Sequence, residues 1–156
     1  MFRPLRRSNR EIENDKVIDL LKNEKRGVLA VHGENDYPYA VPVNYIYDEN
    51  TNKIYFHGAG AGQKYDALMK DNKVCFTVYG NEQYKDGDWA PYMQSVVIFG
   101  KCNKVEENKL DYLRLLARKY YPSDEEIEKE INLAGKIVQV FEITIDHICG
   151  KQIQEK

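Results

Sequence analysis

Apolar and polar residues alternate over much of the chain with the two-residue period of β-strands. Six runs have this pattern or form short apolar stretches between turn residues, and they lie at 28–32, 37–47, 53–57, 73–79, 95–105 and 137–145. The polar turns 33–36 and 48–52 separate the first three runs, so neighbouring runs are predicted to pair as antiparallel hairpins. Gly100, inside the fifth run, predicts a β-bulge.

Apolar residues at helical spacing predict four helices. The first is predicted to begin at Asn14–Asp15, which can cap it, and to end at Gly27. The others are expected at 63–71, 106–120 and 123–135. A parallel doubly wound sheet would need a helix between most of its strands, and this chain has too few. The pattern therefore predicts a mainly β fold, an antiparallel barrel or strongly curved sheet with flanking helices, in a single domain over residues 1–156.

The composition argues against a nucleic-acid or membrane partner. The 156 residues include 23 Lys or Arg and 25 Asp or Glu, so the formal net charge is −2, which does not suit a basic nucleic-acid-binding face. No apolar run is longer than Val96–Phe99, which is far shorter than the roughly 20 residues of a membrane helix. The basic start has no apolar segment behind it and is not a secretory signal. A cytoplasmic location is expected.

The cysteines and histidines are not spaced as metal ligands. There are three of each, and the spacings CxxC, HxH and HExxH do not occur. No metal site is therefore expected. Cys75 and Cys102 alternate with apolar residues in predicted strands, so buried free thiols are the preferred interpretation.

The stretch after the third predicted strand is the most informative for chemistry. Gly58, Gly60 and Gly62 alternate with alanine and are followed by Lys64 at the start of a predicted helix. Alternating glycines let backbone N–H groups turn toward an anion, and the helix N-terminus and the lysine add positive charge. Gln63 replaces the glycine that a nucleotide P-loop requires, and the dinucleotide fingerprint is also absent. These residues fit a phosphate site, but a surface turn followed by an exposed lysine explains them equally well.

Two blocks of sequence around this loop make a family resemblance visible. PYAVPVN at 38–44 and FHGAGAGQK at 56–64 together resemble the FMN-binding split β-barrel superfamily of pyridoxamine 5′-phosphate oxidase. RPLRRSNREI at 3–12, SVVIFGKCNKVEE at 95–107 and ICGK at 148–151 fit its 5-nitroimidazole resistance (nitroimidazole reductase) branch. The resemblance covers nearly the whole chain. It implies a six-stranded split barrel that forms a homodimer, with a flavin, FMN in preference to FAD, at the interface.

The resemblance also implies roles for individual residues. Lys64 matches the phosphate-binding lysine of the family, and Gln63 stands where the oxidase has an arginine. The backbone of 41–44 would border the isoalloxazine ring and 56–57 would lie at its edge, while 95–96 falls where the oxidase contributes a glutamine from its second subunit. The implied cofactor-binding residues are Val41, Pro42, Val43, Asn44, Phe56, His57, Gly58, Ala59, Gly62, Gln63, Lys64, Ser95 and Val96.

His57 is the candidate catalytic residue. An imidazole at the edge of the flavin can donate protons near neutral pH, and reduction of a nitro group consumes protons. A polar residue at the end of a strand can instead bond to the backbone of the adjacent loop. The family match favours the first interpretation.

The departures from the family narrow the predicted function. The R-S-x-x-S and R-x-H motifs that hold the substrate in pyridoxamine 5′-phosphate oxidase are absent, so oxidation of a vitamin B6 phosphate is not expected. The leading hypothesis is an FMN-dependent oxidoreductase that reduces small nitroaromatic or related electron-poor compounds. The alternatives are a flavin-binding or flavin-storage protein without catalysis and a haem-binding split barrel. No nicotinamide-binding motif identifies the electron donor.

Overall fold

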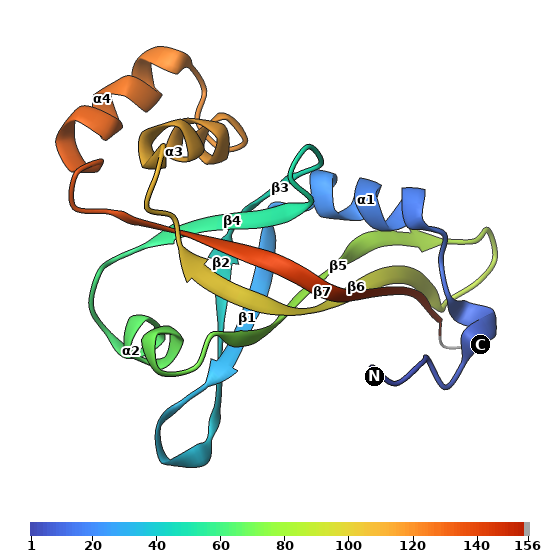
Figure 1. Cartoon of the computed structure of the whole chain (residues 1–156). Coiled ribbons are helices and arrows are strands. Elements are labelled where there is room, and N and C mark those ends of the chain that lie inside the picture. The colour runs from blue at the N-terminus through green and yellow to red at the C-terminus, as the bar shows by residue number, and fades with distance from the viewer. Residues whose placement is uncertain (155–156) are drawn as a thin grey trace.

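A strongly curled antiparallel sheet forms the body of the protein (Figure 1). The computed structural model describes residues 1–154, and within them the strands lie in the order β2-β1-β5-β6-β7-β4-β3, with every neighbouring pair antiparallel. The strands are β1 (Arg26–His32), β2 (Pro38–Asn44), β3 (Ile46–Asp48), β4 (Lys53–Gly58), β5 (Lys73–Tyr84), β6 (Pro91–Lys104) and β7 (Gln139–Gln154). The predicted mainly β, antiparallel architecture is confirmed.

Helices connect and flank these strands. They are η1 (Ser8–Arg10), α1 (Asn14–Asn23), η2 (Glu34–Asp36), α2 (Gln63–Lys70), α3 (Lys109–Arg118) and α4 (Asp124–Ala134). Figure 1 shows that α3 and α4 form a hairpin beside the end of β4, where the chain turns toward α2. Two helical elements that are distant in sequence thus lie near the same end of β4.

The break between β2 and β3 explains why the sheet has seven strands and not the predicted six. Tyr45 lies at this break, and its side chain is completely buried. Its hydroxyl donates to the carbonyl of Leu21 at 2.7 Å, and its N–H donates to the hydroxyl of Tyr120 at 2.7 Å. The backbone here bonds to a side chain instead of a neighbouring strand, and the chain crosses from one edge of the sheet at β2 to the opposite edge at β3.

Two glycines inside strands, Gly27 and Gly100, allow close packing. The predicted helix end at Gly27 is wrong, because α1 already ends at Asn23. Gly27 lies in β1, where a Cβ atom would be 2.2 Å from the Phe76 ring. The bulge predicted at Gly100 is confirmed, because the register between β6 and β7 shifts there. A Cβ atom at Gly100 would lie 2.3 Å from the carbonyl oxygen of Thr144.

Several elements differ in length from the sequence prediction. The predicted tail after 145 instead continues β7 to Gln154, which pairs with Tyr92 of β6. The predicted loop 80–91 is partly strand, because β5 extends to Tyr84 and β6 begins at Pro91. α3 begins at Lys109 and not at 106. These stretches are polar and have no apolar alternation that would predict a strand. Pairing between the long strands β5, β6 and β7 keeps them extended.

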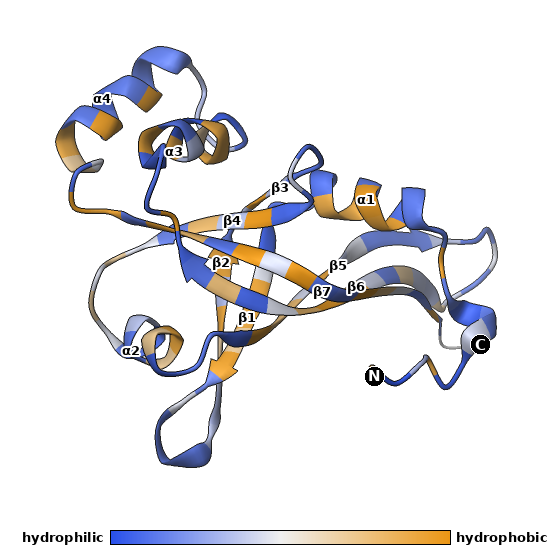
Figure 2. Cartoon of the chain, viewed as in Figure 1, coloured by the Kyte–Doolittle hydropathy of each residue, from blue (hydrophilic) through white to orange (hydrophobic). Residues whose placement is uncertain are grey.

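Two hydrophobic clusters lie on opposite faces of β4. The main core fills the curled sheet, includes Phe56, and is covered by apolar residues of α1. A smaller cluster joins Tyr55 of β4 to Leu113 of α3, and the Tyr55 ring stacks on that of Tyr112 at 4.4 Å. Figure 2 shows apolar positions recurring along the strands and on these helices. Because successive strand residues point to opposite faces, His57 shares the face of Tyr55 and points to the side of the α3–α4 hairpin.

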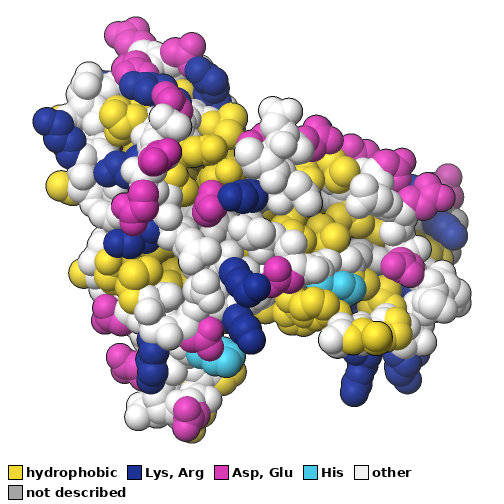
Figure 3. All heavy atoms as spheres, viewed as in Figure 1, with side chains coloured by type: hydrophobic (Ala, Val, Ile, Leu, Met, Phe, Trp, Pro, Cys, Tyr) yellow, Lys and Arg dark blue, Asp and Glu magenta, His cyan; other side chains and the backbone are white. Residues whose placement is uncertain are grey.

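The surface carries charge of both signs. Figure 3 shows acidic and basic side chains interspersed over one face of the molecule. None of the helices in residues 1–154 is long and apolar enough to cross a membrane.

Candidate functional site

The loop from β4 to α2 presents backbone with few side chains. Gly62 is the N-cap of α2 with a φ of +103°, and no side chain caps this end of the helix. A Cβ atom at Gly62 would have no heavy atom within 4 Å, so the positive φ, and not crowding, requires glycine here. The first N–H groups of an α-helix have no intrahelical acceptor. This helix end therefore offers donors and partial positive charge to an anion.

Lys64 brings a full positive charge to the same loop. Its Nζ atom lies 3.3 Å from the position a Cβ atom would take at Gly58 and 5.8 Å from the centre of the Phe56 ring. Burial lowers the pKa of Lys64, and no carboxylate within residues 1–154 forms an ion pair with it. A half-buried ammonium group without a counter-ion, beside uncapped helix amides, fits a phosphate group.

His57 lies between this loop and a cavity. It pairs with Val140 of β7 at the end of β4. His57 is in part exposed to solvent, yet partial burial lowers its pKa and the nearby Lys64 ammonium lowers it further. No hydrogen bond among the described residues involves this ring. The alternative interpretation, in which His57 bonds to the backbone of the adjacent loop, is therefore not supported.

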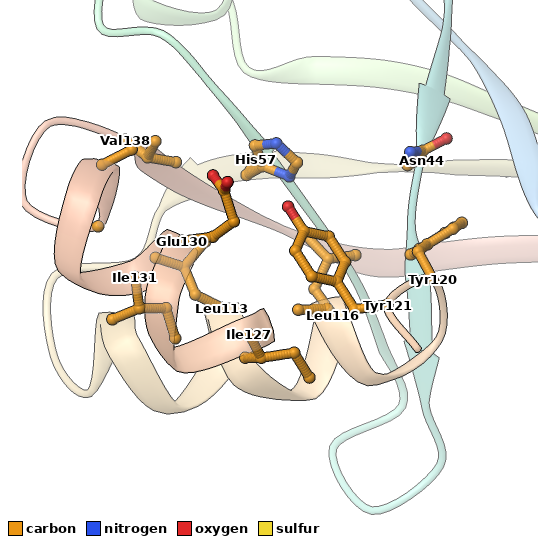
Figure 4. Close-up of a pocket in the computed structure, with 13 residues that line it drawn as sticks. Asn44, His57, Leu113, Leu116, Tyr120, Tyr121, Ile127, Glu130, Ile131 and Val138 are labelled. Carbon is orange, nitrogen blue, oxygen red and sulfur yellow. The ribbon is translucent and has the colours of Figure 1, made fainter. Parts of the chain in front are cut away.

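A cavity of about 130 Å³ lies between the α3–α4 hairpin and the ends of β2 and β4 (Figure 4). Most of its wall consists of aliphatic groups from the two helices, and polar groups are few. The lining residues are Asn44, His57, Leu113, Leu116, Ala117, Tyr120, Tyr121, Ile127, Glu130, Ile131, Ala134, Gly135 and Val138. Figure 4 shows the Glu130 carboxylate and the Tyr121 hydroxyl directed toward His57. The histidine thus has a small apolar pocket in front of it.

The C-terminal end of α3 is tied to the sheet, which fixes the position of this pocket. The Tyr120 hydroxyl accepts from the N–H of Tyr45 and lies 2.6 Å from the carbonyl oxygens of both Tyr45 and Lys25, to which it can donate. Lys119 donates to the carbonyl of Glu24 and lies 3.9 Å from the centre of the Tyr45 ring. Burial lowers the pKa of Lys119 to about 8. These contacts hold the hairpin against the break between β2 and β3.

The structure brings some of the predicted site residues together. Asn44, at the end of β2, lines the same cavity as His57, and Gly58 lies against Lys64. Ala59, Gly62 and Gln63 are exposed on the loop and the first turn of α2. The remaining β2 residues, Val41, Pro42 and Val43, run along β1 toward Asn44.

Other predicted residues lie in the core or far away. The side chains of Phe56 and Val96 are completely buried and that of Val43 nearly so, so only their backbone atoms are available to a ligand. Lys104 of β6 lies across β7 from Phe56, since both pair with Phe141. Ser95 is nine residues earlier on β6, which is roughly 30 Å along an extended strand. One copy of the chain therefore does not bring 95–96 to Lys64 and His57.

Sequence reasoning missed the wall of the cavity. Ile127, Ile131 and Ala134 recur at helical spacing on α4 and predict an apolar face, but the acidic residues between them suggest a solvated helix. Glu130 and Tyr121 are exposed and carry no motif. Only the packing of α4 against α3 places them near His57.

Comparison with known proteins agrees with this fold. The family model described as pyridoxamine 5′-phosphate oxidase matches residues 13–152. The chain belongs to this family. Comparison with curated protein sequences found no match. The family resemblance inferred from PYAVPVN and FHGAGAGQK is therefore confirmed over nearly the whole chain.

Solved structures share the fold at low sequence identity. A putative 5-nitroimidazole antibiotic resistance protein from Bacteroides thetaiotaomicron is 22% identical, with a TM-score of 0.73, and the match covers 91% of this chain and 85% of that one. A conserved hypothetical protein from Mycobacterium tuberculosis is 17% identical, with a TM-score of 0.77 over 95% and 89% of the two chains. A FAD-binding protein from Mesorhizobium loti is 19% identical, with a TM-score of 0.63 over 92% and 97%. The split-barrel fold predicted from the sequence is confirmed.

Proposed function

We propose that this chain binds a flavin and uses it to reduce small nitroaromatic or related electron-poor compounds. The proposal depends above all on Lys64, a half-buried ammonium group without a carboxylate partner beside an uncapped helix start and an open glycine loop. Proteins with this fold include one described as FAD-binding and one described as a putative 5-nitroimidazole antibiotic resistance protein. Those descriptions support the same classes of cofactor and substrate here.

In this proposal the cofactor phosphate binds Lys64 and the first amides of α2. The backbone of 41–44 borders the ring, and His57 lies at its edge. A bound flavin supplies two-electron reduction chemistry. The chain itself holds the phosphate, orients the ring and keeps a substrate next to it in the cavity.

FMN is the proposed flavin. One lysine and one helix end form a compact site that suits a single terminal phosphate, whereas FAD carries a second phosphate and an adenosine beyond it. Acid release of the flavin from purified protein, followed by chromatography, distinguishes the two. FAD as the bound species would contradict this part of the proposal without affecting flavin binding itself.

His57 is the proposed proton donor. Partial burial and the Lys64 charge lower its pKa, which keeps the ring neutral before the cofactor binds. A phosphate on Lys64 offsets that charge, so it returns the pKa of His57 toward its ordinary value and makes proton donation easier near neutral pH.

A second copy of the chain completes the site in this proposal. Ser95 and Val96 lie far along β6 from His57, and the neighbouring strand β5 exposes Tyr79 and Tyr84, which can be covered in a dimer. Sedimentation of the flavin-loaded protein is expected to show a dimer. A stable monomer that retains flavin would contradict the shared site.

Stopped-flow mixing of the reduced, flavin-loaded protein with a 5-nitroimidazole under anaerobic conditions tests the reaction. The flavin is expected to reoxidise faster than free reduced FMN at the same concentration. Equal rates would identify a flavin-binding or storage protein. A sharp Soret band in the visible spectrum of the purified protein would identify the haem-binding alternative.

A further inference from the structure

The size of the cavity beside His57 limits what it can hold. Its volume is about 130 Å³ and its wall is mainly aliphatic, with Leu116 and Ala117 from α3 and Ile131 from α4. Apolar protein cavities of roughly 150 Å³ bind benzene. This partly open cavity can therefore enclose one aromatic ring, whereas the three fused rings of a flavin would extend out of it.

Four of the five polar side chains that line the cavity are free to bind a ligand, and the fifth, Tyr120, is bonded to the backbone. Asn44, His57, Tyr121 and Glu130 all line it, and none of their side chains makes a hydrogen bond or ion pair with another of the described residues. An apolar wall with a few convergent polar groups is typical of small-molecule sites.

The charges near the cavity disfavour an anion. Glu130 is the only carboxylate among the lining residues, and none of these residues is a lysine or an arginine. An anionic ligand would lose its hydration against aliphatic groups and would lie near the Glu130 carboxylate, which forms no ion pair with the other described residues. A neutral ligand would lose no ionic hydration and would not be repelled by Glu130, and it could still form hydrogen bonds with His57, Tyr121 or Asn44.

We propose that this cavity is the substrate pocket and that it selects uncharged, single-ring aromatic compounds over anionic ones. The inference rests on the proposed function, because His57 joins the cavity to the proposed flavin site, and it deepens that function by naming the substrate class. Walls from α3 and α4 hold the ring of the substrate, and the polar groups at the His57 side bind its substituent.

Calorimetric titration with three probes tests the selection, on the protein both with and without FMN. The neutral single-ring probe is 4-nitrobenzyl alcohol, the anionic probe of similar size is 4-nitrobenzoate, and the two-ring probe is 6-nitroquinoline. We expect the neutral single-ring compound to bind at least about tenfold more tightly than either of the others, a difference of about 1.4 kcal/mol. Equal binding of all three would overturn the proposal.

Variants locate the binding in this cavity. Ala117→Leu fills the space from α3, and Ala134→Leu fills it from α4, so one can replace the other if a variant does not fold. Either is expected to weaken 4-nitrobenzyl alcohol at least about tenfold, by the same conversion as above. Glu130→Gln is expected to reduce the discrimination against 4-nitrobenzoate, whereas Glu125→Gln, on the same helix but outside the cavity, is expected to leave it unchanged.

The two proposals fail separately. If the probe binds the cavity but FMN does not bind the protein, the pocket stands and the flavin function is wrong. If FMN binds but both filling variants bind the neutral probe as the unmodified chain does, the cavity is not the substrate pocket and the flavin function stands.

Discussion

The two sides of His57 are built in different ways. On one side, the loop 58–62 and Lys64 are contiguous in sequence and offer backbone donors and positive charge. On the other side, the cavity combines Asn44 from the end of β2 with aliphatic groups of α3 and α4, which lie much further along the chain. One side is polar and open, and the other is apolar and partly enclosed.

The difference has a physical cause. An anion site needs only a few N–H groups and a cation, which one turn and one helix start can supply. An apolar pocket requires walls that meet from several directions, because the hydrophobic effect depends on the apolar area removed from water and not on the direction of single bonds. Changes on the two sides of His57 are therefore expected to separate cofactor binding from turnover.

The largest effect is expected from His57→Ala. General acid assistance is typically worth about 10²–10⁴-fold, so the variant is expected to reduce a nitroaromatic substrate at least about tenfold more slowly, a conservative lower limit. Flavin binding is expected to stay unchanged, since Lys64 and the loop proposed to hold the phosphate are intact. Stopped-flow reoxidation and a flavin titration on the same preparation measure both.

His32→Ala is the matched control, because His32 is exposed at the end of β1 and pairs with Asp71 away from the cavity. A wild-type rate in His57→Ala, or loss of its flavin, would show that His57 is a structural or cofactor-binding residue. Either result would mean that changing His57 does not separate cofactor binding from turnover.

The next effect is expected from Lys64→Ala. A hydrogen bond to a charged group is worth about 1.5–3 kcal/mol, so FMN affinity is expected to fall roughly tenfold to a hundredfold. Lys70→Ala, an exposed lysine in the last turn of the same helix, serves as the control and is expected to bind FMN normally. Fluorescence titration measures the affinity of both variants for FMN. Equal affinities would exclude Lys64 from phosphate binding.

A smaller effect is expected from loosening the cavity side. Tyr120→Phe removes the hydroxyl that bonds to the N–H of Tyr45 and to a backbone carbonyl. Leaving these groups without a partner is expected to cost about 1–3 kcal/mol of unfolding free energy. Urea unfolding measures the change. Tyr121→Phe, whose hydroxyl makes no hydrogen bond in residues 1–154, should unfold like the unmodified chain, and equal stability of both variants would contradict the anchoring role of Tyr120.

The smallest effect is expected in the pH dependence of stability without flavin. Because the pKa of His57 is lowered in the folded protein, the unfolded chain takes up a proton first as the pH falls below about 6.5. The free energy of unfolding should therefore decrease through this range until the folded histidine also titrates. His57→Gln should show a shallower decrease. Identical slopes between pH 7 and 5 in the two proteins would rule out a lowered pKa.

Local pattern was enough for the main strands and hairpins and for the glycine loop before Lys64. The alternation of apolar residues predicted the hairpins, and the polar turn 48–52 joins β3 to β4 as expected. The glycine–alanine repeat before Lys64 predicted an open loop at a helix start, which the structure has. These features depend on neighbours in sequence, so short segments contain the information.

Local pattern failed where the cause lies elsewhere in the chain. Gly27 has the sequence context of a helix end, but the Phe76 ring on another strand is what requires glycine there. The strand 37–47 breaks at Tyr45 because the hydroxyl of Tyr120 accepts its N–H. Neither contact can be predicted from the residues that flank Gly27 or Tyr45 in the sequence.

The amino-acid sequence by itself determined the antiparallel sheet, its main turns and the chemistry of the loop that ends in Lys64. Tertiary structure alone decided that Asn44, His57 and Glu130 line one cavity, and that 95–96 lie far from it within one copy of the chain. Strand period and turn chemistry act over a few residues, whereas a cavity forms only when remote surfaces pack together. For this reason the glycine loop before Lys64 could be predicted from the sequence, and the cavity could not.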